Sequence, residues 1–259
     1  MNKFKKIAVT ALGGALAAST AHAVDVSVSG GSEIGWASGS SNFDSSKASN
    51  FGAGTGVSFS ASGELDNGWT VSTTHATSGA FALTSSNITI DTGSVGKVRI
   101  NRTGAAATNA KDDVLPTAWE EANDNANTSV RGTRLADALT SGSISYISPS
   151  FDLAGGSVSF TVDYDPNIGG GGGNPGTTAA RAANAGSGIA YGANITFGPI
   201  TLHGGYAEEE STLSKDMSDG KNVMVQAIAD MGAVSIGAGE WYANENDGGT
   251  DYSTQGLGI

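Results

Sequence analysis

The sequence predicts an all-β protein, a transmembrane antiparallel β-barrel, from three observations. Apolar residues recur at every second position in about twelve segments, which is the period of a strand with two unlike faces. Gly accounts for 39 of the 259 residues, and Gly, Ser and Thr at this density disfavour long helices. The connections between the segments alternate between short and long, which is typical of an outer-membrane barrel.

The first 23 residues are typical of a bacterial secretory signal peptide. Residues 1–6 are basic, residues 7–16 form a short apolar core, and residues 21–23 (AHA) match a signal-peptidase site. The apolar core is too short to be a membrane anchor, because spanning a bilayer takes about 20 residues. We therefore expect a signal peptide at 1–23, cleaved near Ala23, and a barrel domain at 24–259.

Composition excludes several classes of function. The signal peptide takes three of the 13 basic residues, which leaves 10 basic against 25 acidic residues and a net charge of about −15. Nucleic acid is not an expected partner, because phosphate binding needs clustered Lys and Arg. The chain has no cysteine, so disulfide frameworks, thiolate metal sites and Cys nucleophiles are excluded.

The alternation is clearest in the first two segments, 24–36 and 51–61. In the first, Val26, Val28 and Ile34 share one face, and Ser, Gly and Glu occupy the other. The remaining strand-like segments, in chain order, are 69–73, 88–90, 98–100, 144–146, 158–164, 191–197, 200–206, 223–229, 234–238 and 257–259.

The connections fall into two classes. The short ones are 64–68, 91–96, 149–156, 198–199 and 230–233. The long ones are 37–50, 102–140, 165–186, 208–221 and 243–250. Short turns at one end and long loops at the other favour a barrel in a membrane over a soluble β-sandwich, in which nothing makes the loops long at one end only.

The two faces of the predicted strands favour the same interpretation. One face is filled with Gly, Ser, Thr, Asn and Asp, whereas a soluble sandwich would bury apolar side chains between its sheets. Four aromatic residues lie near segment ends, where a membrane-interface girdle would lie: Trp36, Trp69, Tyr164 and Tyr206. Burial of these aromatics in an ordinary core is the alternative.

Three stretches resemble the general porins of Gram-negative bacteria, which are trimeric diffusion channels. Residues 63–70 (GELDNGWT) are similar to the porin turn G-x-L-x-N-G, and residues 93–102 (GSVGKVRINR) to the strand G-x-x-G-x-V-x-x-G-R. Residues 143–151 (SISYISPSF) resemble the strand I-x-Y-x-S-P-x-F. One departure is Asn101, which stands where the pattern has Gly before Arg102.

The C-terminus departs from the pattern as well. Porins resemble one another in ending on an aromatic residue, whereas this sequence ends at Gly258-Ile259 in mid-alternation. Porin barrels have about 16 strands. We therefore expect a C-terminally truncated sequence that forms an open, curved sheet with unpaired first and last strands. A complete smaller barrel is the alternative.

The resemblance also implies a constriction. The loop at 102–140 is expected to fold inward, with Asp112, Asp113, Glu120, Glu121 and Asp124 on it and Arg131 and Arg134 on its far limb. Lys97 and Arg99 alternate with Val98 and Ile100, so they are expected to face the lumen beside Arg102. Acids facing bases would create a transverse field across the pore. Charges exposed to bulk water are the alternative.

The implied function is passive diffusion of small hydrophilic solutes and ions through a homotrimer in the outer membrane, among lipid and lipopolysaccharide. No catalytic residue, cofactor or metal site is expected, because His75 and His203 are isolated. The net charge and the loop acids predict a mild preference for cations. The alternatives are a surface structural or adhesive β protein, and a secreted β-sandwich enzyme or sugar-binding domain.

Overall fold

A computed structural model describes residues 25–41, 44–79, 81–111, 114–116, 135–136, 139, 142–166, 168, 186–211, 220–245 and 251–259. The predicted signal peptide lies outside these residues. The strands are β1 (Asp25–Ser41), β2 (Asp44–Glu64), β3 (Thr70–Ser78), β4 (Leu83–Asp91), β5 (Lys97–Thr103), β6 (Ile144–Ile147), β7 (Phe151–Leu153), β8 (Gly156–Asp165), β9 (Gly186–Phe197), β10 (Ile200–Ser211), β11 (Gly220–Asp230), β12 (Ser235–Glu245) and β13 (Asp251–Gly258). A single 3₁₀ turn, η1, spans Asn109–Lys111.

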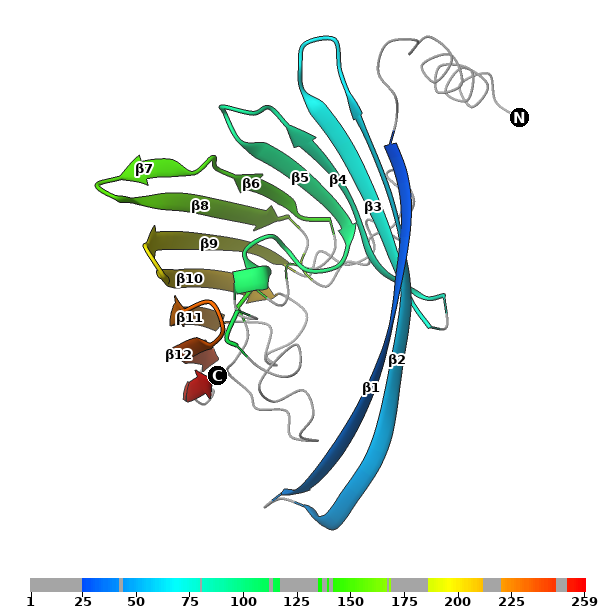
Figure 1. Ribbon diagram of the computed structural model, residues 1–259, viewed down its shortest axis with the longest axis vertical. Coiled ribbons are helices and arrows are strands. Elements are labelled where there is room, and N and C mark those ends of the chain that lie inside the picture. The colour runs from blue at the N-terminus through cyan, green and yellow to red at the C-terminus, as the bar shows by residue number, and fades with distance from the viewer. Residues whose placement is uncertain are drawn as a thin grey trace.

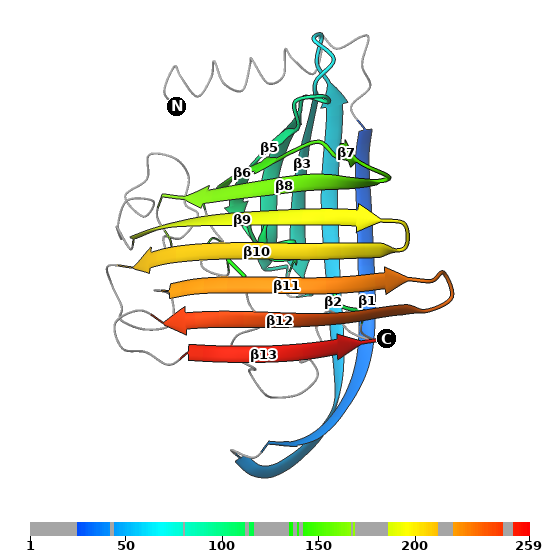
Figure 2. The same ribbon diagram turned by 90° about the vertical axis from the view of Figure 1, so that its left-hand side faces the viewer.

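All strands belong to one antiparallel, 13-stranded sheet whose spatial order follows the chain, with β7 paired to β8 off the main path. Figures 1 and 2 show that this sheet is strongly curved. Within the described residues β1 and β13 are its two edges, so the sheet is open. The predicted open antiparallel sheet is therefore confirmed.

The strand count exceeds the expected twelve because the stretch 149–156, predicted as a short connection, contains an additional short strand, β7. β7 follows β6 along the same neighbour, β8, after an interruption at Pro149. Proline has no N–H to donate to a ladder. Beside it, Ser148 continues the pairing, since its N–H donates to the carbonyl of Phe160 at 2.9 Å.

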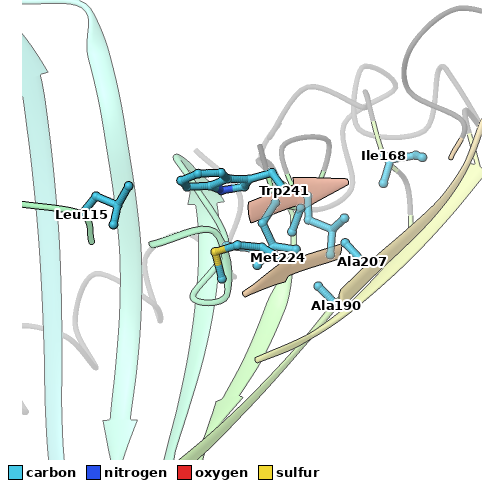
Figure 3. Close-up of a cluster of buried hydrophobic side chains, with 10 residues drawn as sticks. Leu115, Ile168, Ala190, Ala207, Met224 and Trp241 are labelled. Carbon is cyan, nitrogen blue, oxygen red and sulfur yellow. The ribbon is translucent and has the colours of Figure 1, made fainter. Parts of the chain in front are cut away.

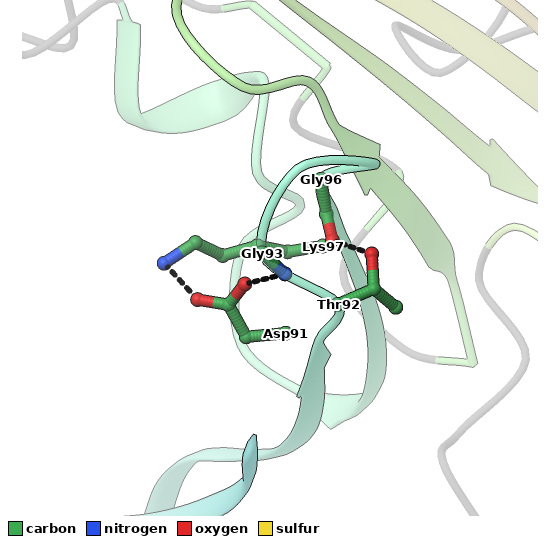
Figure 4. A network of polar contacts seen from close by, with 5 residues as sticks. All are labelled: Asp91, Thr92, Gly93, Gly96 and Lys97. Atoms are coloured by element: carbon green, nitrogen blue, oxygen red, sulfur yellow. Dashed lines mark hydrogen bonds and ion pairs between the residues drawn. The ribbon is translucent and has the colours of Figure 1, made fainter. Parts of the chain in front are cut away.

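The short connections form tight turns because their residues supply the required backbone geometry. Gly68 has φ +79° and donates its N–H to the carbonyl of Leu65, which closes the β2–β3 turn. In the β4–β5 turn the carboxylate of Asp91 accepts the N–H of Gly93 at 2.9 Å. Figure 4 shows this contact. The turns after β9 and β11 lie on the same side of the sheet, as Figure 2 shows.

Burial on the two faces of the sheet is the reverse of that in a soluble protein, because apolar side chains are exposed and polar side chains are buried. In β6, Ile144 and Tyr146 are 46% and 40% exposed, whereas Ser145 between them is fully buried. The same alternation buries polar residues of the strands, namely Ser86, Asn101, Ser145, Thr161, Asp163, Asp165, Glu209 and Gln226. Three polar residues of the connection between β5 and β6 are buried as well: Thr108, Lys111 and Ser143. The convex, outward face is therefore apolar, as suits lipid, and the concave face is polar.

Two tyrosines are paired on the outward face near the middle of β9 and β10. Tyr191 and Tyr206 are paired across β9 and β10, and their rings stack with centroids 6.4 Å apart. One step further along the strands, Lys221 and Glu208 form an ion pair at 3.3 Å. Along β10 apolar side chains are thus followed by a tyrosine and then by a charge, which is the order of layers at a membrane interface.

The four aromatics singled out in the sequence are not core residues where the structure describes them. Trp69 and Tyr164 are both exposed, and Tyr206 is half-buried. The side chain of Trp36 lies outside the described part. Burial in an ordinary core is thus excluded for Trp69 and Tyr164.

The buried apolar side chains do not lie between two sheets. They come from strands β9 to β12 and from the connections that follow β5 and β8, and Figure 3 labels six of them. The cluster consists of Ala106, Leu115, Leu135, Ala136, Leu139, Ile168, Ala190, Ala207, Met224 and Trp241. The described residues therefore form no β-sandwich. In the same described part of the chain, no helix is long and apolar enough to cross a bilayer.

A charge on the outward face should destabilise the protein in lipid. Leu202 is 42% exposed and lies between Ile195 and Ala227 on the neighbouring strands. We expect Leu202→Arg to lower the free energy of unfolding in lipid vesicles by about 2–4 kcal/mol. Val95 is exposed in the β4–β5 turn, so Val95→Arg should change it by less than about 0.5 kcal/mol. Equal, small effects would contradict a lipid-facing surface.

Candidate functional site

The segment between β5 and β6 lies on the concave side of the sheet in its described parts, as the position of η1 in Figure 1 shows. It contacts the wall where the wall has glycine. A Cβ atom at Gly188 would lie 2.7 Å from Leu139, and one at Gly237 would lie 2.7 Å from Pro116. Side chains at Gly192 and Gly205 would clash with Lys111 and Leu135 respectively. The segment therefore rests directly on the backbone of β9, β10 and β12.

Asp163 fastens this segment to β8. Its carboxylate accepts the N–H of Ala107 at 3.2 Å and that of Thr108 at 2.6 Å. Strand alternation turns Asp163 inward, because its neighbours Val162 and Tyr164 take the opposite face. The side chain is fully buried.

Lys111, at the end of η1, forms hydrogen bonds with two further strands. Its ammonium donates to Asn194 Oδ1 on β9 at 3.1 Å, and its carbonyl accepts Gln226 Nε2 of β11 at 2.8 Å. Asn194 Oδ1 also lies 2.9 Å from His203 Nδ1 on β10. Burial lowers the pKa of Lys111 below its ordinary value, and the nearby negative charge of Asp163 opposes this shift.

Arg99 meets the same segment from β5. Its Nη2 donates to the carbonyl of Ala105 at 2.9 Å, and the negative charge of Asp163 attracts its half-buried guanidinium. Ile100 beside it is exposed on the outward face. Arg99 thus lies on the side of the connecting segment, opposite to Ile100.

Asn101 joins the two ends of the connecting segment. Its amide donates to Ser143 Oγ at 3.0 Å and to the carbonyl of Ala105 at 3.4 Å. Its backbone N–H also donates to the carbonyl of Ser143 at 2.9 Å. A Gly at this position, as in the pattern quoted from porins, has no side-chain amide and so cannot make the first two contacts.

The other predicted site residues are placed elsewhere or lie outside the described residues. Lys97 forms an ion pair with Asp91 at 2.7 Å beside the short β4–β5 turn, as Figure 4 shows. Arg102 is exposed and lies at a register shift between β4 and β5, where strand alternation does not fix its direction. Seven residues are outside the described part: Asp112, Asp113, Glu120, Glu121, Asp124, Arg131 and Arg134.

Sequence reasoning missed the residues that carry most of these contacts, namely Lys111, Asp163, Asn194, His203 and Gln226. A signal for Asp163 was present, because it alternates with Val162 and Tyr164 and so must take the polar face. Its partners are 55 and 56 residues away in the chain, and no local pattern connects them. Among the described residues, no group of His, Cys, Asp and Glu could hold a metal ion.

Comparison with known proteins agrees with this geometry. A family model described as Gram-negative porin matches residues 8–259. A porin structure refined at 1.8 Å is similar, with 18% identity and a TM-score of 0.51 over 89% of this chain and 76% of that chain. An anion-selective porin from Comamonas acidovorans is similar at 15% identity and a TM-score of 0.51, over 91% and 73% of the two chains. At these identities the likeness shows the fold alone. No curated protein gave a match.

Two neighbouring glycines of β10 test how the segment is seated. Gly205 faces Leu135, whereas Gly204 faces open space on the outward side. We expect Gly205→Val to lower the free energy of unfolding by about 1–3 kcal/mol, because the added side chain displaces Leu135. Gly204→Val should be neutral or slightly stabilising, since valine suits a strand better than glycine does. Denaturant titration in vesicles measures both, and equal losses would contradict the seating on Gly205.

Proposed function

Because the chain belongs to the Gram-negative porin family, we propose that it forms a water-filled channel for passive diffusion of small hydrophilic solutes and ions. The observation that carries this proposal is the polar concave face of the sheet beneath an apolar convex face. A water-filled lumen needs hydrogen-bonding groups on its wall, and lipid needs their absence on the other side.

The narrowest part of the proposed channel lies at the segment between β5 and β6. Support comes from its seat on the concave side of the wall, where it occupies space that solutes would otherwise cross. We propose that Lys97, Arg99 and Arg102 belong to the lining. On sequence grounds we add Asp112, Asp113, Glu120, Glu121, Asp124, Arg131 and Arg134.

The family places the protein in the outer membrane of Gram-negative bacteria. We further propose cleavage of the signal peptide near Ala23, assembly into a homotrimer, and contact with lipid and lipopolysaccharide. The barrel domain would then be residues 24–259. Transport through such a lumen needs no covalent step, so the proposal assigns no catalytic residue and no cofactor.

Reconstitution tests the proposed function directly. The purified protein in planar bilayers should produce discrete conductance steps. Liposomes containing it should swell in small sugars and stop swelling above a solute size limit. Protein-free vesicles and heat-denatured protein are the controls. Inserted, folded protein that neither conducts nor admits sugars would contradict the channel.

We propose a mild preference for cations, supported by the net charge of about −15 after signal removal and by the acids that follow Lys111. Reversal potentials in a salt gradient measure this preference. Asp112→Lys with Asp113→Lys should lower it, whereas Asp66→Lys in the exposed β2–β3 turn should not. A clear anion preference, the property named for the similar Comamonas porin, would contradict the proposal.

A further inference from the structure

Asp163 is buried on the concave face, yet its two hydrogen-bond donors are backbone groups of the connecting segment. The N–H groups of Ala107 and Thr108 belong to the turn that leads into η1. A buried carboxylate is costly unless hydrogen bonds and opposite charges compensate for the lost water. Asp163 has the two hydrogen bonds directly, and the opposite charges act on it from a longer distance.

Two cations from other elements attract Asp163 at longer range than an ion pair. Arg99 comes from β5 and Lys111 from η1, and the negative charge of Asp163 favours the charged form of both. Each cation also donates a hydrogen bond elsewhere, Arg99 to the carbonyl of Ala105 and Lys111 to Asn194. The carboxylate is thus the shared anion of a cluster that joins β5, β8, β9 and the connecting segment.

This geometry gives Asp163 a different part from that of a lumen-lining acid. Its side chain is 0% exposed, so a solute in the channel has no access to it. Its hydrogen bonds hold residues 105–111, the first limb of the connecting segment, against the wall. A change at Asp163 would therefore act through the position of that limb.

We propose that Asp163 is a positioning residue that locks the root of the constricting segment to β8 and so sets the width of the channel. The inference rests on the proposed channel function. In Asp163→Asn the amide retains one acceptor oxygen but loses the charge, and its NH₂ group cannot accept a hydrogen bond from either backbone N–H. The limb should then loosen.

Hydrogen exchange tests the lock without reference to transport. In Asp163→Asn, the amide of Thr108 should exchange about tenfold faster or more than in the unsubstituted protein, because it loses a charge-assisted hydrogen bond. Asp152→Asn removes the same charge from the exposed strand β7 and should leave this amide unchanged. Unchanged exchange at Thr108 in Asp163→Asn would overturn the inference, whether or not the protein conducts.

Single-channel recording and liposome swelling test the consequence for width. Asp163→Asn should give larger, noisier conductance steps and admit larger sugars, and Asp152→Asn should not. A shifted reversal potential with an unchanged size limit would overturn the inference, since Asp163 would then act through charge alone.

If Asp163→Asn fails to fold, Lys111→Met is the variant to test, because it loosens the same root of the segment. An unaltered size limit and Thr108 exchange in that variant would overturn the inference. Loss of channel activity in the unsubstituted protein would count against the proposed function instead.

Discussion

The structure depends on hydrogen bonds between the backbone N–H and C=O groups of neighbouring strands that have lipid on one side. A bilayer offers no water to these groups, so the strands must bond to one another and present apolar side chains outward. Because side chains alternate along a strand, the opposite face is then free to be polar. The exposed Ile144 and Tyr146 around buried Ser145 are the local form of this constraint.

The polar concave face explains why the segment between β5 and β6 can pack there. Glycines of β9, β10 and β12 let Lys111, Leu135 and Pro116 approach the wall backbone. Asp163 and Asn101 provide the directional bonds at the start of the segment. Packing of small wall residues against apolar loop residues thus supplies the contact area, and the buried polar groups fix one position within it.

Much of the fold follows from local sequence, and much of the site does not. Alternation in segments such as 200–206 predicts strands and their outward faces, and Asn67-Gly68 predicts a turn with positive φ. The same alternation gives the direction of Arg99. Asn101 and Asp163 gain their roles from partners on other strands or far along the chain, 42 residues away for Ser143. Charge alone did not reveal the ion pair between Lys97 and Asp91.

Site-directed labelling tests the alternation most directly, because the chain has no native cysteine to interfere. Single cysteines at consecutive positions 200–207 of β10 would carry a spin label in lipid vesicles. The account predicts that a lipid-soluble paramagnetic agent accelerates the relaxation of spin labels at Leu202 and Tyr206. A water-soluble agent should accelerate the relaxation of labels at Thr201 and His203. A uniform response along the strand, or the opposite phase, would contradict an apolar outward face over a polar lumen.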